Sequence, residues 1–217
     1  YAKASPDDIL IRITVANRGP EPAVMHLLPT LWFRNTWSWG CTHEGCEVKP
    51  RIELADGRLR ATHRTLGKFL LAAAGVSTSG VSTDPSPSFL FTDNETNHER
   101  VFGSANGTQH VKDAFHEYIV RGRRDAVNDT SVGTKAAAHY NLTVPAGGQV
   151  VVRLRLCSQE VSPTEPFGPD FDRIFVDRLR ETDEFYDAHI PRTRSAEERR
   201  VARQAYAGLL WSKQFYH

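Results

Sequence analysis

The sequence lacks any apolar run long enough to cross a membrane. Its longest candidate, FLLAAAGV at 69–76, falls far short of the roughly 20 apolar residues that a transmembrane helix needs. The chain shows no basic segment followed by an apolar one, which is the pattern of a secretory leader, and it begins with Tyr1 instead of Met. We therefore predict no membrane partner, and we expect the sequence to be a piece of a longer protein.

An excess of charge of one sign is also lacking. Lys and Arg number 27 and Asp and Glu number 26, which leaves a formal net charge of +1. Proteins that bind nucleic acid or anionic membranes through their bulk charge carry a clear basic excess. The composition gives no support to a nucleic-acid partner, and we predict none.

Cysteine is scarce, with three residues in the chain. An odd number this small does not make the disulfide framework of a small secreted domain, so we predict a reducing compartment, the cytoplasm. A secreted glycoprotein is the alternative, because Asn-x-Ser/Thr triplets, which can accept a glycan, begin at Asn94, Asn106, Asn128 and Asn141. Phosphate loops, nucleotide fingerprints and G-x-S-x-G turns are absent from the sequence, so we predict no cofactor.

Short β-like segments separated by Gly and Pro occupy the first 158 residues. Residues 9–15 alternate in polarity, and 24–33 is a second run, in which Pro29 predicts an edge strand, a bulge or a break in the ladder. An Asp-Gly pair within 51–63 is the strongest hairpin signal in the chain. Further strands are expected at 88–94, 114–122, 135–144 and 150–158. This pattern predicts a mainly β fold, an antiparallel β-sandwich.

The pattern becomes helical after a Pro-rich connector at 162–170. Apolar residues recur at spacings of three and four from Phe171 to Tyr186, which predicts an amphipathic helix. A second helix should begin at the capping box formed by Ser195 and Glu198 and continue to the last residue.

The expected last helix carries an apolar stripe that is unusual for a solvated terminal helix. The stripe consists of Val201, Ala205, Leu209 or Leu210, Trp211 and Phe215. We expect this surface to pack against a part of the protein outside the chain, and we expect the isolated chain to self-associate through it.

Five segments, in order, carry a resemblance to a known family. They are LWFRNTWSWG, LFTDNETN, VKDAFHEYIV, GTKAAAHYNLTVPAGG and AGLLWSKQFYH. Together they resemble bacterial proteins similar to glycoside hydrolase family 63, the processing glucosidases (mannosyl-oligosaccharide glucosidase-like). The resemblance implies a β-sandwich of the supersandwich type over 1–158, a linker with a helix over 159–194, and the first helix of a truncated (α/α)6 barrel over 195–217.

The same resemblance implies where the chemistry lies. Enzymes of this family hydrolyse α-glucosidic or related bonds of oligosaccharides with inversion, and their catalytic carboxylates lie in the barrel. We therefore predict no catalytic residue in this chain, because the acids are expected beyond His217. The chain would be a noncatalytic N-terminal domain of a bacterial cytoplasmic enzyme, inactive alone, with the barrel of the same protein as its partner. A carbohydrate-binding module and a purely structural interaction domain are the alternatives.

Three acids of the chain could nevertheless suggest catalysis. Inverting glycosidases use two carboxyl groups roughly 6.5–9.5 Å apart, and the sequence assigns that geometry to no pair among Glu95, Asp113 and Glu117. On the expected strand, residues four apart share a face without flanking a sugar. We predict hydrogen bonds within loops and hairpins for these acids instead.

The loop RNTWSWGCTHEGC at 34–46 and two polar loops provide the candidate contact residues. Aromatic faces pack on other domains or on sugar rings, and amide and charged side chains at loop tips bind partners or lock the loop. We predict substrate-binding or interdomain roles for Arg34, Asn35, Trp37, Trp39, Asn94, Glu95, Lys112, Asp113 and His116. For Trp37 and Trp39 we favour a contact with another domain over a contact with an oligosaccharide. Trp32 is expected in the core. Loops bonded only to themselves are the alternative.

Cys41, His43 and Cys46 lie together in the first of these loops. They are ligand types that zinc accepts, but their spacing matches no standard finger or ribbon. We predict free thiols and no metal site, with a disulfide and a zinc site as the open alternatives.

Overall fold

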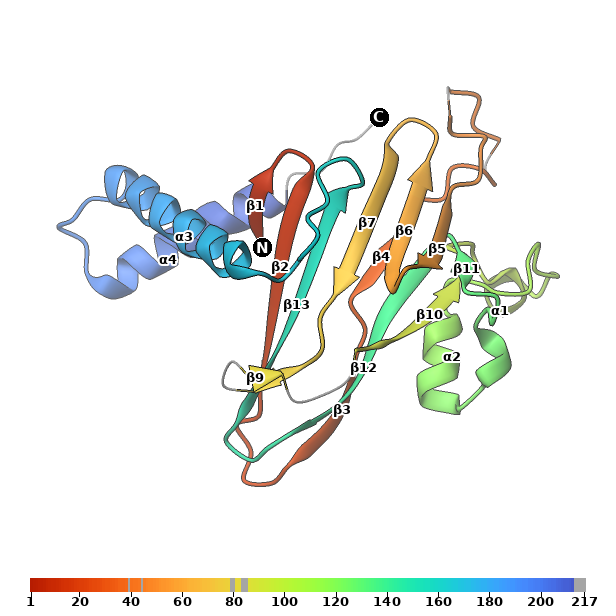
Figure 1. The fold of residues 1–217 in the computed structure, drawn as a ribbon, viewed down its shortest axis with the longest axis horizontal. Helices are drawn as coiled ribbons and strands as arrows, with labels where there is room; N and C mark the ends of the chain where they lie inside the picture. The colour runs from red at the N-terminus through yellow and green to blue at the C-terminus, as the bar shows by residue number, and fades with distance from the viewer. Residues whose placement is uncertain (39, 44, 79–80, 83–85, 213–217) are drawn as a thin grey trace. The chain divides into compact units, whose positions relative to one another are not determined.

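The computed structural model describes residues 1–38, 40–43, 45–78, 81–82 and 86–212. The fold is mainly β, with antiparallel sheets followed by helices in the C-terminal part (Figure 1). Two compact units are present: Tyr1 and Lys3–Gly168 form the first, and Ala2 and the residues from Pro169 onward form the second. No helix among the described residues has the length and apolar character that crossing a membrane would require.

The larger sheet of the first unit contains nine of the described strands. Its order is β1-β2-β13-β7-β6-β5-β11, and β8 joins it by pairing with both β13 and β9. The strands are β1 (Ala2–Ser5), β2 (Asp8–Ala16), β5 (Arg51–Ala55), β6 (Arg58–His63), β7 (Gly67–Ala73), β8 (Ser77–Thr78), β9 (Val81–Ser82), β11 (Val132–Gly133) and β13 (Gln149–Ser158).

The smaller sheet has four of the described strands with the long strand β12 at its centre. They are β3 (Ala23–Leu27), β4 (Thr30–Trp32), β10 (Ser88–Thr92) and β12 (Lys135–Val144). Strand β12 pairs with β10, with β4 at its start and with β3 at its end. Pro29 lies between β3 and β4, which confirms the predicted interruption.

The predicted hairpin at 51–63 is confirmed. Strands β5 and β6 pair in antiparallel register around Asp56 and Gly57, which have φ values of 52° and 72°. Two successive positive φ angles are the requirement of the tight two-residue turn that matches the twist of a hairpin. The predicted strands near 9–15, 88–94, 135–144 and 150–158 are also present as β2, β10, β12 and β13.

The predicted strand at 114–122 is wrong, because this segment is the helix α2 (Ala114–Arg121). Gly122 ends the helix in the left-handed conformation, φ 68°, a common helix stop. Helix α2 buries Ala114, Phe115 and Glu117, and Phe115 packs with Leu90 of β10. The short helix α1 (His98–Phe102), the 3-10 turn η1 (Arg124–Ala126) and strand β7 were not predicted, although β7 overlaps the apolar run at 69–76.

The main hydrophobic core draws side chains from both sheets. Ile52, Leu59 and Leu71 come from the larger sheet, and Phe91 and Leu142 from the smaller one. A second, smaller cluster joins Leu90, Phe115 and Ala137 where α2 lies against β10. Strand β12 is therefore buried on both faces at Ala136–Ala138, which all have 0% exposure.

The second unit contains the helices α3 (Pro169–His189) and α4 (Ala196–Trp211). The capping box of α4 is confirmed: the Ser195 side chain accepts from the Glu198 backbone N–H, and the Glu198 side chain accepts from the Ser195 backbone N–H. The helix ends at Trp211, with Ser212 as its C-cap, so the prediction that it continues to the last residue is wrong. Residues 213–217 lie outside the described part of the chain.

Candidate functional site

Four side chains from three segments meet in a network that we call the polar cluster: Trp37, Lys49, Asp93 and Glu95. Oε1 of Glu95 accepts from the indole N–H of Trp37 at 2.9 Å and from Nζ of Lys49 at 3.0 Å. Lys49 also contacts Oδ2 of Asp93 at 2.8 Å. The cluster thus ties the 34–46 loop to the segment that follows β10.

Electrostatics stabilises the charged form of Lys49. Burial opposes its charge, but the hydrogen bonds and the attraction from Asp93 and Glu95 outweigh burial and raise its pKa above the ordinary value. Asp93 is fixed in turn, because its Oδ1 accepts from the backbone N–H of Thr134 at 3.1 Å and its Oδ2 accepts from the Thr108 hydroxyl at 3.3 Å.

A second network surrounds Asp113 at the start of α2. The Asn97 amide donates to both carboxylate oxygens of Asp113, at 3.1 and 3.2 Å, and Arg100 donates to its Oδ2 at 3.0 Å. Glu117 lies between Arg100, at 3.7 Å, and Arg121, at 3.2 Å. The acids Glu95, Asp113 and Glu117 are thus each engaged by cations within the fold, as expected for acids with a structural role.

The structure places the other predicted site residues in different environments. Asn94 is half-buried, and its amide donates to the Phe33 carbonyl at 2.9 Å. The Lys112 backbone N–H donates to the Glu95 carbonyl at 2.9 Å, so Lys112 lies next to the polar cluster. Asn35 is buried and accepts from the Ser38 N–H and hydroxyl.

Three further predicted residues do not join these networks or cannot be placed. Arg34 and His116 are exposed. Trp39 lies outside the described residues. The structure therefore brings together Trp37, Glu95, Lys112 and Asn94, and it shows that these loops bond extensively to one another.

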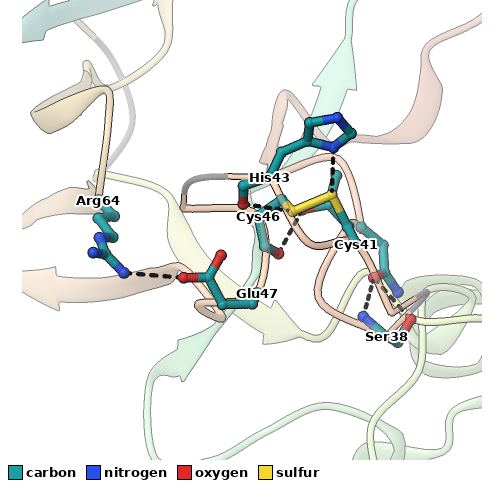
Figure 2. Close-up of a disulfide and its surroundings, with 8 residues drawn as sticks. Ser38, Cys41, His43, Cys46, Glu47 and Arg64 are labelled. Carbon is teal, nitrogen blue, oxygen red and sulfur yellow. Dashed lines mark hydrogen bonds and ion pairs between the residues drawn. A yellow bond between two sulfur atoms is a disulfide. The ribbon is translucent and has the colours of Figure 1, made fainter.

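The 34–46 loop contains a disulfide between Cys41 and Cys46 (Figure 2). The prediction of free thiols is wrong for this pair, because the turn after His43 brings the two sulfurs together. His43 also lies close, with its Nδ1 at 3.4 Å from the Cys41 sulfur. Among the described residues, Cys41, His43 and Cys46 are the group of three potential ligands that could hold a metal ion. Cys157 is a free, buried cysteine, and burial raises its pKa.

Trp32 was expected in the core, but 55% of it is exposed. Leu31 packs against the main core, and strand alternation then directs Trp32 to the opposite face. An apolar hollow of about 250 Å³ lies beside it, lined by Leu31, Trp32, Phe33, Ala61, His63, Leu66, Gly67, Phe69 and Leu156. The rings of Phe33 and His63 stack there, with centroids 5.5 Å apart. This hollow was not predicted from the sequence. The alternation of Leu31 and Trp32 along the strand could have indicated that Trp32 is exposed.

Comparison with known proteins gives one informative relationship. No protein-family model matches the chain. Over 239 aligned residues the chain is 34% identical to the uncharacterized protein YMR196W of Saccharomyces cerevisiae. The alignment covers 98% of this chain and 22% of the yeast protein, so the chain spans less than a quarter of that relative's length.

Proposed function

We propose that this chain is the noncatalytic N-terminal part of a larger glycoside hydrolase of the family 63 type. In this proposal it supports a catalytic barrel that hydrolyses α-glucosidic or related bonds of oligosaccharides. The five-segment resemblance suggests the family, and the much greater length of the yeast relative is consistent with a larger protein. The two sheets with a shared core would form the sandwich, of the supersandwich type.

The observation that carries the proposal is the apolar surface of α4. Val201 and Leu209, eight positions apart and so near the same side of the helix, are 56% and 72% exposed. Burying a Val or Leu side chain typically contributes about 1.5–3 kcal/mol, so this exposed surface favours a partner. In the proposal that partner is the rest of the barrel, whose first helix would be α4.

The polar cluster supplies the rigidity that a supporting domain needs. Glu95, Asp93 and Lys49 hold one another, and Glu95 holds the Trp37 indole in a defined position. Docking of the barrel against this loop is part of the proposal. Catalysis would belong to barrel carboxylates, one protonating the leaving oxygen and one activating water.

A cytoplasmic location in a bacterial cell belongs to the same proposal. Because Cys41 and Cys46 form a disulfide, free thiols no longer support a reducing compartment. Cytosolic proteins nevertheless form disulfides that are transient or redox-sensing. Trapping thiols by rapid alkylation in acid-quenched cells tests the location: a mostly reduced Cys41–Cys46 pair supports the cytoplasm, and a fully oxidised pair contradicts it.

The proposed function is tested by comparing this 217-residue chain with the protein made from its gene up to the natural stop codon. Both are assayed on a panel of α-linked glucosyl and mannosyl disaccharides. Activity in the longer protein alone is the expected result. Activity of the short chain, or inactivity of both on every substrate, contradicts the proposal.

A carbohydrate-binding module is the second candidate function, and the apolar hollow beside Trp32 favours it. Exposed aromatic faces next to an apolar hollow can pack on the C–H faces of sugars. Calorimetric titration of the chain with maltose and related glucosides tests this function. Binding that is lost in Trp32→Ala and kept in Trp37→Ala supports it, because Trp37 is held by Glu95. Absence of binding leaves the supporting role.

A further inference from the structure

We propose that Cys41, His43 and Cys46 form a redox-gated zinc site: the oxidised pair is closed as a disulfide, and the reduced loop binds one Zn²⁺ through both sulfurs and the His43 ring. The inference is independent of the proposed hydrolase role. It starts from the position of His43, which spacing along the sequence did not reveal.

One of the three ligand separations, from the Cys41 sulfur to the His43 ring, already matches what zinc requires, whereas the disulfide holds the two sulfurs at bonding distance. The two sulfurs and the nearest ring nitrogen lie within 4.8 Å of one another. Tetrahedral zinc has Zn–S bonds of about 2.3 Å and Zn–N bonds of about 2.0–2.1 Å, which together place sulfur and nitrogen roughly 3.6 Å apart. The observed distance from Cys41 Sγ to His43 Nδ1 is 3.4 Å. Reduction needs only to let the two sulfurs separate.

Contacts other than the disulfide hold the ligands in place. The Cys46 N–H donates to the His43 carbonyl at 3.1 Å, and the Thr36 hydroxyl donates to the Cys46 carbonyl at 3.0 Å. Gly45 has a φ of +81°, and a Cβ at this position would lie 2.8 Å from the Thr65 side chain. The loop geometry therefore depends on hydrogen bonds and on a glycine that packs closely, and we expect it to persist after reduction.

The site is open to solvent, which both reduction and metal entry require. His43 is exposed and both cysteines are half-buried. Figure 2 shows the His43 ring turned toward the Cys41 sulfur, with the Glu47–Arg64 ion pair beside the loop. Cys157, by contrast, is buried and does not contribute to this site.

The reductant of the disulfide is a small-molecule thiol of the glutathione class. The attacking thiolate bonds to one cysteine sulfur and the other sulfur leaves as a thiolate; a second thiol then releases the first cysteine and leaves as a small-molecule disulfide. Two electrons pass to the cysteine pair. Zn²⁺ then displaces the two thiol protons and binds both thiolates and the neutral imidazole, with water completing four ligands.

The test is a titration of the purified chain with Zn²⁺, in the oxidised form and after reduction with a phosphine, against a chromophoric chelator. We expect one equivalent bound by the reduced chain and none by the oxidised chain. His43→Ala should weaken binding at least about 100-fold, since loss of even an outer-shell partner of a ligand costs 10–100-fold. Co²⁺ in place of Zn²⁺ should give the visible absorption of a tetrahedral thiolate site.

The control is His98→Ala, which removes another exposed histidine and should leave the affinity unchanged. Near-ultraviolet circular dichroism of the reduced chain without metal must match that of the oxidised chain. The proposal is overturned if reduced wild-type chain binds no zinc, if His43→Ala binds as tightly as wild type, or if reduction alone abolishes the tertiary signal.

Discussion

The indole N–H of Trp37 donates to Oε1 of Glu95 at 2.9 Å, which joins two loops that lie 58 positions apart in the sequence. The same oxygen accepts from Lys49, so removal of the carboxylate leaves the indole N–H without its acceptor and leaves Lys49 with Asp93 alone. We expect Glu95→Ala to lower the free energy of unfolding by about 1–3 kcal/mol, the cost of unsatisfied, partly buried polar groups. Urea denaturation followed by tryptophan fluorescence measures the change.

The control for this variant is Glu47→Ala, directly after the 34–46 loop. Glu47 pairs with Arg64 at 3.0 Å, but both side chains are about half exposed, and exposed pairs contribute at most about 1 kcal/mol. Equal effects of the two substitutions would show that the polar cluster does not hold the loop.

Asp8 and Arg155 form a buried bidentate ion pair between β2 and β13, with distances of 2.9 and 2.5 Å. Both residues are under 10% exposed. Asp8→Ala leaves a buried guanidinium without its carboxylate, and we expect a loss of about 3–5 kcal/mol in the free energy of unfolding. Arg155→Met combined with Asp8→Ala should be less damaging than Asp8→Ala alone, because the buried guanidinium that has lost Asp8 is removed as well.

A double-mutant cycle by urea denaturation checks this prediction. Asp125→Ala, which removes the partner of Arg123 in an exposed pair, serves as the control and should leave stability unchanged. A double variant no more stable than Asp8→Ala would contradict the expectation that the guanidinium left without Asp8 causes the loss.

Gly133, the last residue of β11, lies close to the backbone of Thr92 at the end of β10. A Cβ at this position would lie 2.2 Å from the Thr92 carbonyl oxygen, and a backbone atom cannot move aside as a flexible side chain can. We expect Gly133→Ala to cost about 1–3 kcal/mol, as overpacking typically does. Thermal unfolding measures the loss, and Gly107→Ala is the control, since a Cβ there meets no atom within 4 Å. Similar melting temperatures for the two variants would contradict the steric explanation.

His139 and His26 lie side by side on β12 and β3, with ring nitrogens 2.8 Å apart. Burial lowers the pKa of His139, and the neighbouring His26 lowers it further; the Ser88 hydroxyl and the edge of the Tyr118 ring also face it. The unfolded chain therefore binds this proton more readily than the native one. The stabilisation is complete above the ordinary histidine pKa of 6.5 and is lost as pH falls through the lowered value.

Urea unfolding at a series of pH values from neutral to mildly acidic measures this dependence. His139→Gln should flatten the acid-side loss of stability, and His98→Ala, which removes an exposed histidine, should leave the slope unchanged. An unaltered slope in His139→Gln would show that other groups cause the acid sensitivity.

Local signals predicted much of the fold. The Asp56-Gly57 turn, the Pro29 interruption and the Ser195 capping box each depend on residues within a few positions of one another, and each is present. The strand prediction for 114–122 was wrong because the residue pattern of this segment fits both a strand and a helix. Packing of Phe115 on Leu90 decides between the two, and that contact joins segments distant in the sequence.

The candidate site was predictable in composition but not in arrangement. Trp37, Asn94, Glu95 and Lys112 were identified as polar or aromatic loop residues, and the structure brings them together. Lys49 and Asp93 were missed because nothing in their local sequence indicates that they meet Glu95. The approach of His43 to Cys41 depends on how the turn folds, which ligand spacing alone does not define.

The three consecutive alanines of β12 have a consequence for how this protein can change over time. Ala136 and Ala138 face one core and Ala137 the other, so a larger side chain at any of these positions collides with a packed layer. We expect sequence drift there to be confined to the smallest residues. This segment should therefore change slowly among descendants and serve as an anchor for aligning remote relatives.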